Sequence, residues 1–242
     1  LLVTRSRPDA AAMQERLEAA GHRVTVEPLI SIEPIDAGPL ELAGVQALVA
    51  TSRNAVRAVV GVANFSVARC LPLIVVGPGT ADEAHRIGFA RIAAGPAAAS
   101  DLLEVVKASL DPTAGALLHL AGETVAFDLA AGLSAAGFDT RQQVVYRANP
   151  RARFTRSAEQ LLREGAIDAV TLMSPRTAAV YAELAARHEL GDAIAAVAHL
   201  CLSATVSARL APLGPVVVEI AGQPNLEEML ALVARVAAQS RP

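Results

Sequence analysis

An internal repeat constrains the fold of this chain more than any other feature of its sequence. Leu1–Leu2 followed by Ala19–Gly21 recurs as Leu117–Leu118 followed by Ala135–Gly137, at the same spacing. Two shorter blocks recur in the same order further along the chain: Val49–Arg53 with Thr171–Pro175, and Val76–Thr80 with Leu202–Val206. The repeated segment, about half of the chain, is much longer than one unit of a solenoid protein. The chain is therefore predicted to be a duplicated half-molecule.

Each half alternates short apolar runs with longer helical patterns, and such alternation predicts doubly wound parallel sheets of the α/β class. Because 53% of the residues are apolar but only 3% are aromatic, small aliphatic side chains must fill the core, which suits helices packed on sheets. The strand candidates are Leu1–Thr4, Val24–Leu29, Ala47–Ala50, Leu73–Val76, Ala116–Leu120, Gln142–Tyr146, Ala169–Met173, Ala196–Leu202 and Val216–Ile220. The helical patterns are Asp9–Ala20, Asn54–Val62, Thr80–Ile87, Asp101–Ser109, Val125–Ala136, Arg176–Arg187, Val206–Ala211 and Leu226–Gln239.

Size, charge and cysteine content exclude several classes of protein. The 242 residues suffice for two ordinary domains, and a net charge of −3 provides no basic field for nucleic acid. No stretch of about 18 uncharged apolar residues indicates a membrane span. Cys70 and Cys201 lack the spacing of a disulfide framework or a zinc site. Without signal-peptide regions or a long exposed apolar helix face, we expect a cytoplasmic monomer.

Two segments interrupt the alternation of strands and helices. Ser31–Gly38 and Arg147–Arg153 each contain a proline, and each follows the last strand of a copy of the first block. Extended segments that contain proline make semi-rigid linkers, so both are candidate connectors. Two ordinary surface loops remain the alternative interpretation.

Small hydroxyl or glycine residues lie between several strands and the helices that follow them. Free backbone N–H groups and the helix dipole favour anions at such positions, and ligands of open α/β sheets bind at this edge. For any single residue, plain helix capping explains the pattern, but six such turns predict an anion-receptive cleft. The turns are Thr4–Ser6, Thr51–Asn54, Gly77–Thr80, Ala121–Glu123, Ser174–Thr177 and Ser203–Thr205.

Other kinds of catalytic site find little support. Gly77–Thr80 is neither a complete dinucleotide fingerprint nor a phosphate loop with its lysine, and no nucleophile elbow or metal-binding motif is present. His119 and His199 lie within strand candidates, which favours a place at the edge of the core. Tyr146 ends a strand beside a connector, where its phenol can donate a proton or a hydrogen bond; a structural role is the alternative.

Taken together, these residues resemble the uroporphyrinogen-III synthase family along essentially the whole chain. The resemblance lies in the order and spacing of weak motifs more than in any one of them. The matching motifs are Leu2–Ser6, Ala19–Gly21, Pro28–Ile30, Thr51–Val56, Val76–Ala81, Gly88, Gly122, Gly137, Val145–Tyr146, Ser174–Pro175 and Pro224–Leu226.

The resemblance implies two α/β domains joined by a two-stranded antiparallel linker. The first domain would be discontinuous, built from residues 1–32 and 150–242, with residues 39–144 inserted as the second domain. Residues 33–38 and 145–149 would form the two linker strands. A hinge of this kind lets two domains close on a substrate.

The resemblance also implies the reaction. The family converts the linear tetrapyrrole hydroxymethylbilane to uroporphyrinogen III, with loss of water, inversion of the last pyrrole ring and ring closure. A substrate with eight carboxylates suits a cleft lined by helix N-termini. Positioning would then be the main catalytic contribution. No cofactor or metal is expected. Apart from the substrate, the expected partner is hydroxymethylbilane synthase, in transient contact.

Individual site residues follow from the same resemblance. Tyr146 matches the family's tyrosine and is the expected catalytic residue, assisting departure of the substrate hydroxyl. The expected substrate-binding residues are Arg5, Ser52, Asn54, Thr80, Gly122, Ser174 and Thr205. Two positions depart from the family pattern: Glu123–Phe127 lacks the arginine often found there, and Ser203 and Val206 replace a glycine and a threonine.

Three other functions stay open at this point. A non-catalytic regulator of the same fold, binding a tetrapyrrole or another small anion, would fit the altered turns. A two-lobed solute-binding protein would fit the hinge, although no signal peptide is present. A flavin or nucleotide enzyme is less well supported, because the sequence offers neither a phosphate loop nor aromatic residues for stacking.

Overall fold

The computed structural model describes residues 1–95, 99–125 and 128–239. The chain divides into two compact units: Leu1–Ser31 with Asn149–Pro242 form unit 1, and Ile32–Ala148 form unit 2. The chain thus leaves unit 1 once, completes unit 2, and returns. Within the described ranges, no helix is both long and apolar enough to cross a membrane.

Unit 1 is built on a parallel sheet that is five-stranded in the described part of the chain. Its strands, in spatial order, are β11 (Val218–Ile220), β10 (Ala198–Cys201), β9 (Ala169–Leu172), β1 (Leu2–Val3) and β2 (Thr25–Val26). Every neighbouring pair runs in the same direction. All carboxyl ends of these strands therefore lie along one edge of the sheet.

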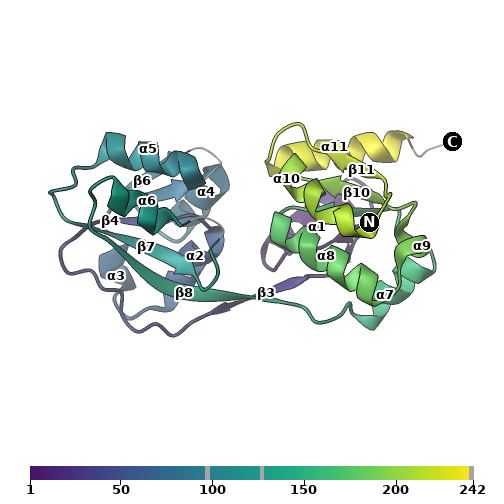
Figure 1. Cartoon of the computed structure of the whole chain (residues 1–242), viewed down its shortest axis with the longest axis horizontal. Helices are drawn as coiled ribbons and strands as arrows, with labels where there is room; N and C mark the ends of the chain where they lie inside the picture. The colour runs from purple at the N-terminus through teal and green to yellow at the C-terminus, as the bar shows by residue number, and fades with distance from the viewer. Residues whose placement is uncertain (96–98, 126–127, 240–242) are drawn as a thin grey trace. The chain divides into compact units, whose positions relative to one another are not determined.

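Helices cover both faces of the unit 1 sheet (Figure 1). Met13 of α1 (Asp9–Ala19) and Leu232 of α11 (Leu226–Gln239) pack with Leu200 on one face. On the other face, the Tyr181 ring of α8 (Pro175–Arg187) lies 5.5 Å from the His199 ring. The remaining helices are α7 (Arg156–Arg163), α9 (Gly191–Ile194), α10 (Ala204–Ser207) and the 3-10 helix η2 (Ala208–Leu213).

The unit 2 sheet has six strands in the described part of the chain. They are, in spatial order, β3 (Ile30–Pro34), β8 (Thr140–Pro150), β7 (Ala116–Gly122), β4 (Val45–Ala50), β5 (Leu73–Val76) and β6 (Ile92–Gly95). The pairs from β8 to β6 are parallel. By contrast, β3 is antiparallel to β8: Ile35 N–H donates to the Val145 carbonyl, while Arg151 N–H donates to the Leu29 carbonyl. These two strands carry the chain between the units.

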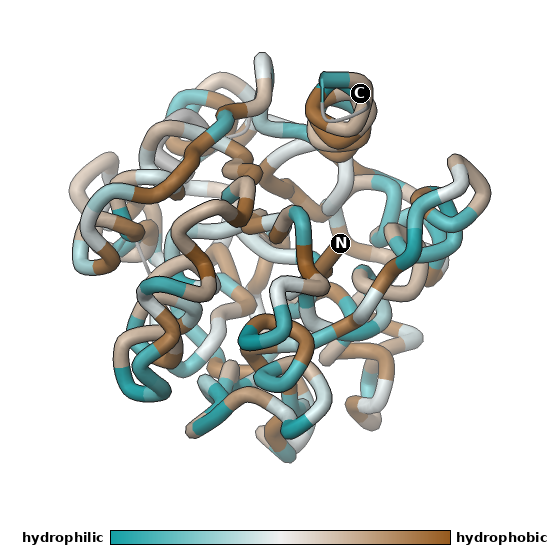
Figure 2. Tube along the Cα trace, turned by 90° about the vertical axis from the view of Figure 1, so that its right-hand side faces the viewer, coloured by the Kyte–Doolittle hydropathy of each residue, from teal (hydrophilic) through white to brown (hydrophobic). Residues whose placement is uncertain are grey.

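Helices also cover both faces of the unit 2 sheet. Val56 of α2 (Arg53–Ala58) and Ala84 of α4 (Pro78–Arg86) pack on one face, together with the 3-10 helix η1 (Val59–Gly61) and α3 (Phe65–Ala68). Val106 of α5 (Ala99–Ser109) and Leu133 of α6 (Leu129–Ala135) pack on the other face. In Figure 2 apolar and polar stretches alternate along the trace, as expected for helices with one buried side. The predicted fold class is confirmed.

The two sheets have the same strand order, and the repeated blocks are distributed between them in a way that makes unit 1 discontinuous in sequence. Strands β2-β1-β9-β10-β11 of unit 1 correspond in position to β8-β7-β4-β5-β6 of unit 2. Strands β1 and β7 come from the first repeated block, β4 and β9 from the second, and β5 and β10 precede the turns of the third. Each unit therefore joins the first block of one copy to the second and third blocks of the other.

Several predicted elements differ from the observed ones. Strand β6 was not predicted, because its alanines gave no strand pattern, and neither were α3, α7 and α9. The predicted helix Val125–Ala136 begins only at Leu129, after the Asp128 side chain accepts a hydrogen bond from Ala131 N–H; residues 126–127 lie outside the described residues. Strand β8 continues past Tyr146, so this tyrosine does not end its strand.

Two buried histidines give the fold an expected sensitivity to acid. His119 of β7 and His199 of β10 are 1% and 0% exposed, so both are buried rather than at the edge of the core as the sequence predicted. Burial lowers the pKa of both imidazoles below the ordinary value of 6.5. The rings therefore stay neutral in the folded state at a pH where the unfolded chain already binds protons. We expect the free energy of unfolding to fall below pH 6.5 and to level off below the folded-state pKa values.

Urea unfolding between pH 8 and pH 5.5 measures this loss. His119→Gln and His199→Gln should each make the unfolding midpoint less dependent on pH. His85→Gln is the matched control for the substitution itself, because His85 is exposed. An unaltered slope in both buried variants would contradict the assignment.

Candidate functional site

The candidate residues of unit 2 lie in a row along the carboxyl edge of its sheet. Tyr146 belongs to β8, Gly122 ends β7, Ser52 follows β4, and Thr80 follows β5, and these four strands are neighbours in that order. The chain direction across the sheet reverses between β7 and β4. Open α/β sheets bind ligands at such a switch point, outside the carboxyl ends of the strands.

Tyr146 and Gly122 are in direct contact. They are register partners across β8 and β7, just beyond an irregularity at Ala121. A Cβ atom placed on Gly122 would lie 2.7 Å from Cζ and 2.9 Å from Oη of Tyr146, so the missing side chain at Gly122 provides the room for the phenol ring. The half-buried ring also packs on the apolar core of unit 2. The tyrosine hydroxyl is thus held at the sheet edge by two strands.

Ser52, Asn54 and Thr80 surround the N-termini of two helices. Ser52 caps α2, its Oγ accepting a hydrogen bond of 3.1 Å from Asn54 N–H. Thr80 lies in the first turn of α4 and is 7% exposed. Arg53, which the sequence reasoning missed, places its guanidinium carbon 3.5 Å from where a Cβ of Gly79 would be. Its position directly after Ser52 was the available signal.

An ion pair adjoins the contact between Tyr146 and Gly122. Arg147 donates from Nε and Nη2 to both carboxylate oxygens of Glu123, each at 2.8 Å. Glu123 N–H in turn donates to the Tyr146 carbonyl at 2.9 Å. The hydrogen bonds from Arg147 lower the pKa of the Glu123 carboxyl. An arginine of the neighbouring strand, Arg147, thus lies beside the turn that follows Gly122.

Unit 1 presents its candidate residues along the equivalent edge, after β1, β9 and β10. Arg5 follows β1, is 9% exposed, and donates from Nη2 to Asp9 Oδ2 at 2.9 Å. Ser174 caps α8 by accepting a hydrogen bond of 3.1 Å from Thr177 N–H. Thr205 is exposed, with its Oγ1 2.9 Å from Ser203 Oγ. The capping interpretation thus holds for Ser52 and Ser174, and the Ser174 hydroxyl also lies 2.8 Å from the Thr177 hydroxyl.

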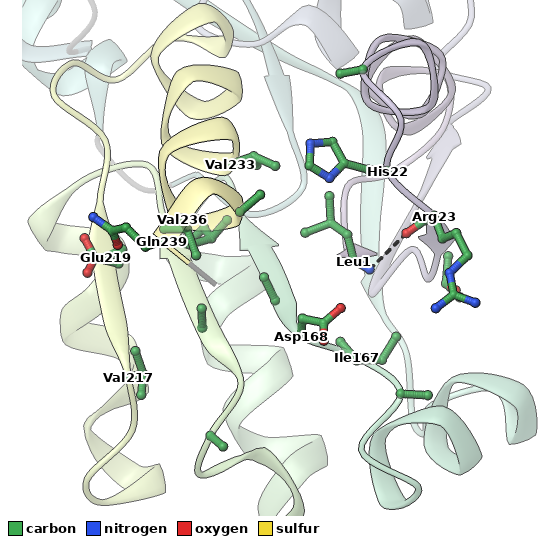
Figure 3. Close-up of a pocket in the computed structure, with 18 of the residues that line it drawn as sticks. Leu1, His22, Arg23, Ile167, Asp168, Val217, Glu219, Val233, Val236 and Gln239 are labelled. Carbon is green, nitrogen blue, oxygen red and sulfur yellow. Dashed lines mark hydrogen bonds between the residues drawn. The ribbon is translucent and has the colours of Figure 1, made fainter. Parts of the chain in front are cut away.

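A cavity of about 840 Å³ lies at the opposite, amino edge of the unit 1 sheet. Figure 3 shows Leu1, Asp168 and Val236 among its lining residues, with the Leu1 ammonium donating to the Arg23 carbonyl at 3.0 Å. The buried alanines Ala169 and Ala198 also line it, and their small side chains leave room there. None of the eight candidate residues lines this cavity. It is therefore separate from the row predicted from sequence.

Tyr181, the second tyrosine of the chain, lies in a different environment from Tyr146. It is fully buried, and burial raises the pKa of its phenol. Its hydroxyl has no hydrogen-bond partner among the described residues. Among the described residues, no three His, Cys, Asp or Glu side chains lie close enough together to bind a metal ion. Of the two tyrosines, only Tyr146 lies at the carboxyl edge of a sheet among the candidate residues.

Comparisons with known proteins bear on this arrangement. A family model described as uroporphyrinogen-III synthase HemD matches residues 11–231, whereas comparison with curated protein sequences gives no match. The solved uroporphyrinogen-III synthetase of Helicobacter pylori 26695 is 17% identical, with a TM-score of 0.64 over 97% of this chain and 98% of that one. A mutant uroporphyrinogen III synthase of Thermus thermophilus is 17% identical, with a TM-score of 0.61 over 99% and 98%.

The two kinds of comparison carry different weight. At 17% identity, the likeness to the solved structures concerns the fold alone. The family model, however, spans most of the sequence, including most of both segments of unit 1 and all of unit 2. The chain belongs to the uroporphyrinogen-III synthase family.

Proposed function

We propose that this protein is a uroporphyrinogen-III synthase, a lyase that cyclises hydroxymethylbilane to uroporphyrinogen III with inversion of the last ring and loss of water. The observation that carries the proposal is the Tyr146 phenol, held against Gly122 at the carboxyl edge of a parallel sheet. Membership of the family supports the substrate class, a linear tetrapyrrole.

The proposed role of Tyr146 is to assist departure of the substrate hydroxyl. The electron-rich pyrrole expels the hydroxyl and becomes an azafulvenium cation, and the phenol donates its proton to the departing oxygen, giving water and a phenolate. The proton released when the closing macrocycle regains its aromatic pyrroles restores the phenol. A general acid of this kind contributes on the order of a hundredfold or more to the rate.

The remaining candidate residues are proposed to hold carboxylates of the substrate. Ser52, Asn54 and Thr80 lie where N–H groups at helix starts favour anions. Arg5, Ser174 and Thr205 are proposed as further contacts on the equivalent edge of unit 1. Fixing the substrate in a reactive geometry supplies the larger share of catalysis. The last pyrrole ring must react at its substituted carbon, and not at its unsubstituted carbon, for the ring to be inverted.

Three finer features belong to the same proposal. We expect a cytoplasmic protein that acts as a monomer and makes transient contact with hydroxymethylbilane synthase. Hydroxymethylbilane closes spontaneously to the type I isomer, so delivery from one enzyme to the next limits that loss.

A coupled assay tests the function. Hydroxymethylbilane is generated with its synthase, this protein is added, and the oxidised porphyrin isomers are separated. We expect predominantly the type III isomer. If a sample shown to be folded by circular dichroism yields only type I, the protein is a binding protein on this fold and the proposed activity is wrong.

A further inference from the structure

The pair of Glu123 and Arg147 occupies a special position in unit 2. Glu123 directly follows Gly122, the last residue of β7, and Arg147 directly follows Tyr146 on β8. Since neighbouring residues of a strand point to opposite faces, the Arg147 side chain of β8 points away from the face that carries Tyr146, and its partner Glu123 lies just beyond the end of β7. Both reach the same carboxyl edge, where the ligand of an open α/β sheet binds.

The geometry of the pair is that of a carboxylate receptor. Nε and Nη2 of Arg147 each donate over 2.8 Å to a different oxygen of Glu123, which is the parallel, two-bond arrangement that guanidinium groups make with any carboxylate. The Glu123 side chain thus occupies a place that a ligand carboxylate would fit. The backbone bond from Glu123 N–H to the Tyr146 carbonyl fixes the two strands around it.

Solvent exposure makes this pair exchangeable. Both side chains are 48% exposed, and exposed ion pairs contribute little to stability. A carboxylate that arrives from solution can therefore replace Glu123 at small cost. Glu33 of strand β3 adds a second negative charge to the surroundings of Arg147. This charge disfavours the binding of isolated small anions to the arginine.

We propose that Arg147 is a specificity-determining residue that binds one carboxylate of the substrate, and that Glu123 occupies it until the substrate arrives. This inference rests on the proposed function for the identity of the substrate. A polycarboxylate already held by other contacts displaces Glu123, because its carboxylate is presented at high local concentration. An isolated small carboxylate lacks that advantage.

Variants of the pair test the proposal through KM and kcat. Arg147→Gln should raise KM about tenfold, the effect of losing one two-bond ionic contact, with little change in kcat. Glu123→Gln should lower KM by a few-fold, because it removes the internal competitor. In the double variant, Glu123→Gln should no longer lower KM.

A matched control comes from the same strand. Arg141 of β8 also forms an exposed ion pair, with Asp139 at 3.2 Å, but it lies at the amino end of the strand. Arg141→Gln should leave KM unchanged. If Arg147→Gln also leaves KM unchanged, or if Glu123→Gln raises KM as Arg147→Gln does, the pair is structural and the proposal is wrong.

A binding titration separates this inference from the proposed activity. Uroporphyrin III carries the eight carboxylates of the product and, being already cyclised, cannot be turned over, so it serves as the probe. We expect the dissociation constant to rise about tenfold in Arg147→Gln and to fall in Glu123→Gln, whether or not the wild-type protein makes the type III isomer. Equal affinities of the wild type and Arg147→Gln for uroporphyrin III would overturn the inference even in an active enzyme.

Discussion

Tyr146→Phe should lower the turnover of hydroxymethylbilane by on the order of a hundredfold, with little effect on KM or on stability. The substitution removes only the hydroxyl. The ring remains, so its packing against Gly122 and the core of unit 2 is preserved. Any loss of rate then reports the proton or hydrogen bond that the phenol donates to the departing oxygen.

The measurement compares initial rates and isomer ratios in the coupled assay, together with urea unfolding. Because the spontaneous reaction gives the type I isomer, a slowed enzyme should shift the product from type III toward type I. Full turnover in Tyr146→Phe would remove the general acid, leaving catalysis to positioning and to the reactivity of the pyrrole itself.

The chain supplies its own control for this experiment. Tyr181→Phe removes the hydroxyl of the other tyrosine, which is buried and has no partner in the described part of the chain. A buried unpaired hydroxyl destabilises the fold, so this variant should keep full turnover and gain up to about 1 kcal/mol in free energy of unfolding. The two substitutions are chemically identical and differ only in position.

The fold could be read from the sequence because its signals are local and repeated. The strand Leu73–Val76 was predicted with its observed bounds, since a short apolar run before a glycine turn has few other interpretations. Strand β6 was missed because Ile92–Gly95 holds two alanines, which favour helices. Strand β8 was predicted too short because its second half is defined by pairing with β3, far away in the sequence.

For the candidate site, too, local signals could be predicted from the sequence and long-range contacts could not. Each residue at the end of a strand could be named from the turn that follows it, as for Ser52 and Ser174. The contact between Gly122 and Tyr146 depends on the register of β7 against β8, including the irregularity at Ala121, and no local pattern specifies that register. The ion pair of Glu123 and Arg147 depends on the same register and was missed for the same reason.

Gly122→Ala is expected to reduce turnover at least as strongly as Tyr146→Phe, although it leaves every catalytic group in the chain. The new Cβ would lie 2.7 Å from Cζ of Tyr146, so the ring must move, and its hydroxyl moves with it. Overpacking of this kind costs about 1–3 kcal/mol of stability. The half-buried ring can turn toward solvent, which should keep the protein folded.

A matched glycine and a double variant identify the cause of the loss. In Gly132→Ala, the nearest atom to the new Cβ is Leu103 Cδ2 at 3.9 Å, and Gly132 lies within helix α6, so this variant should remain fully active and gain about 0.5–1 kcal/mol of stability. In a Tyr146→Phe background, Gly122→Ala should reduce turnover little further, because the hydroxyl it displaces is already absent. If the two losses multiply instead, Gly122 contacts the substrate directly and does not act by positioning Tyr146.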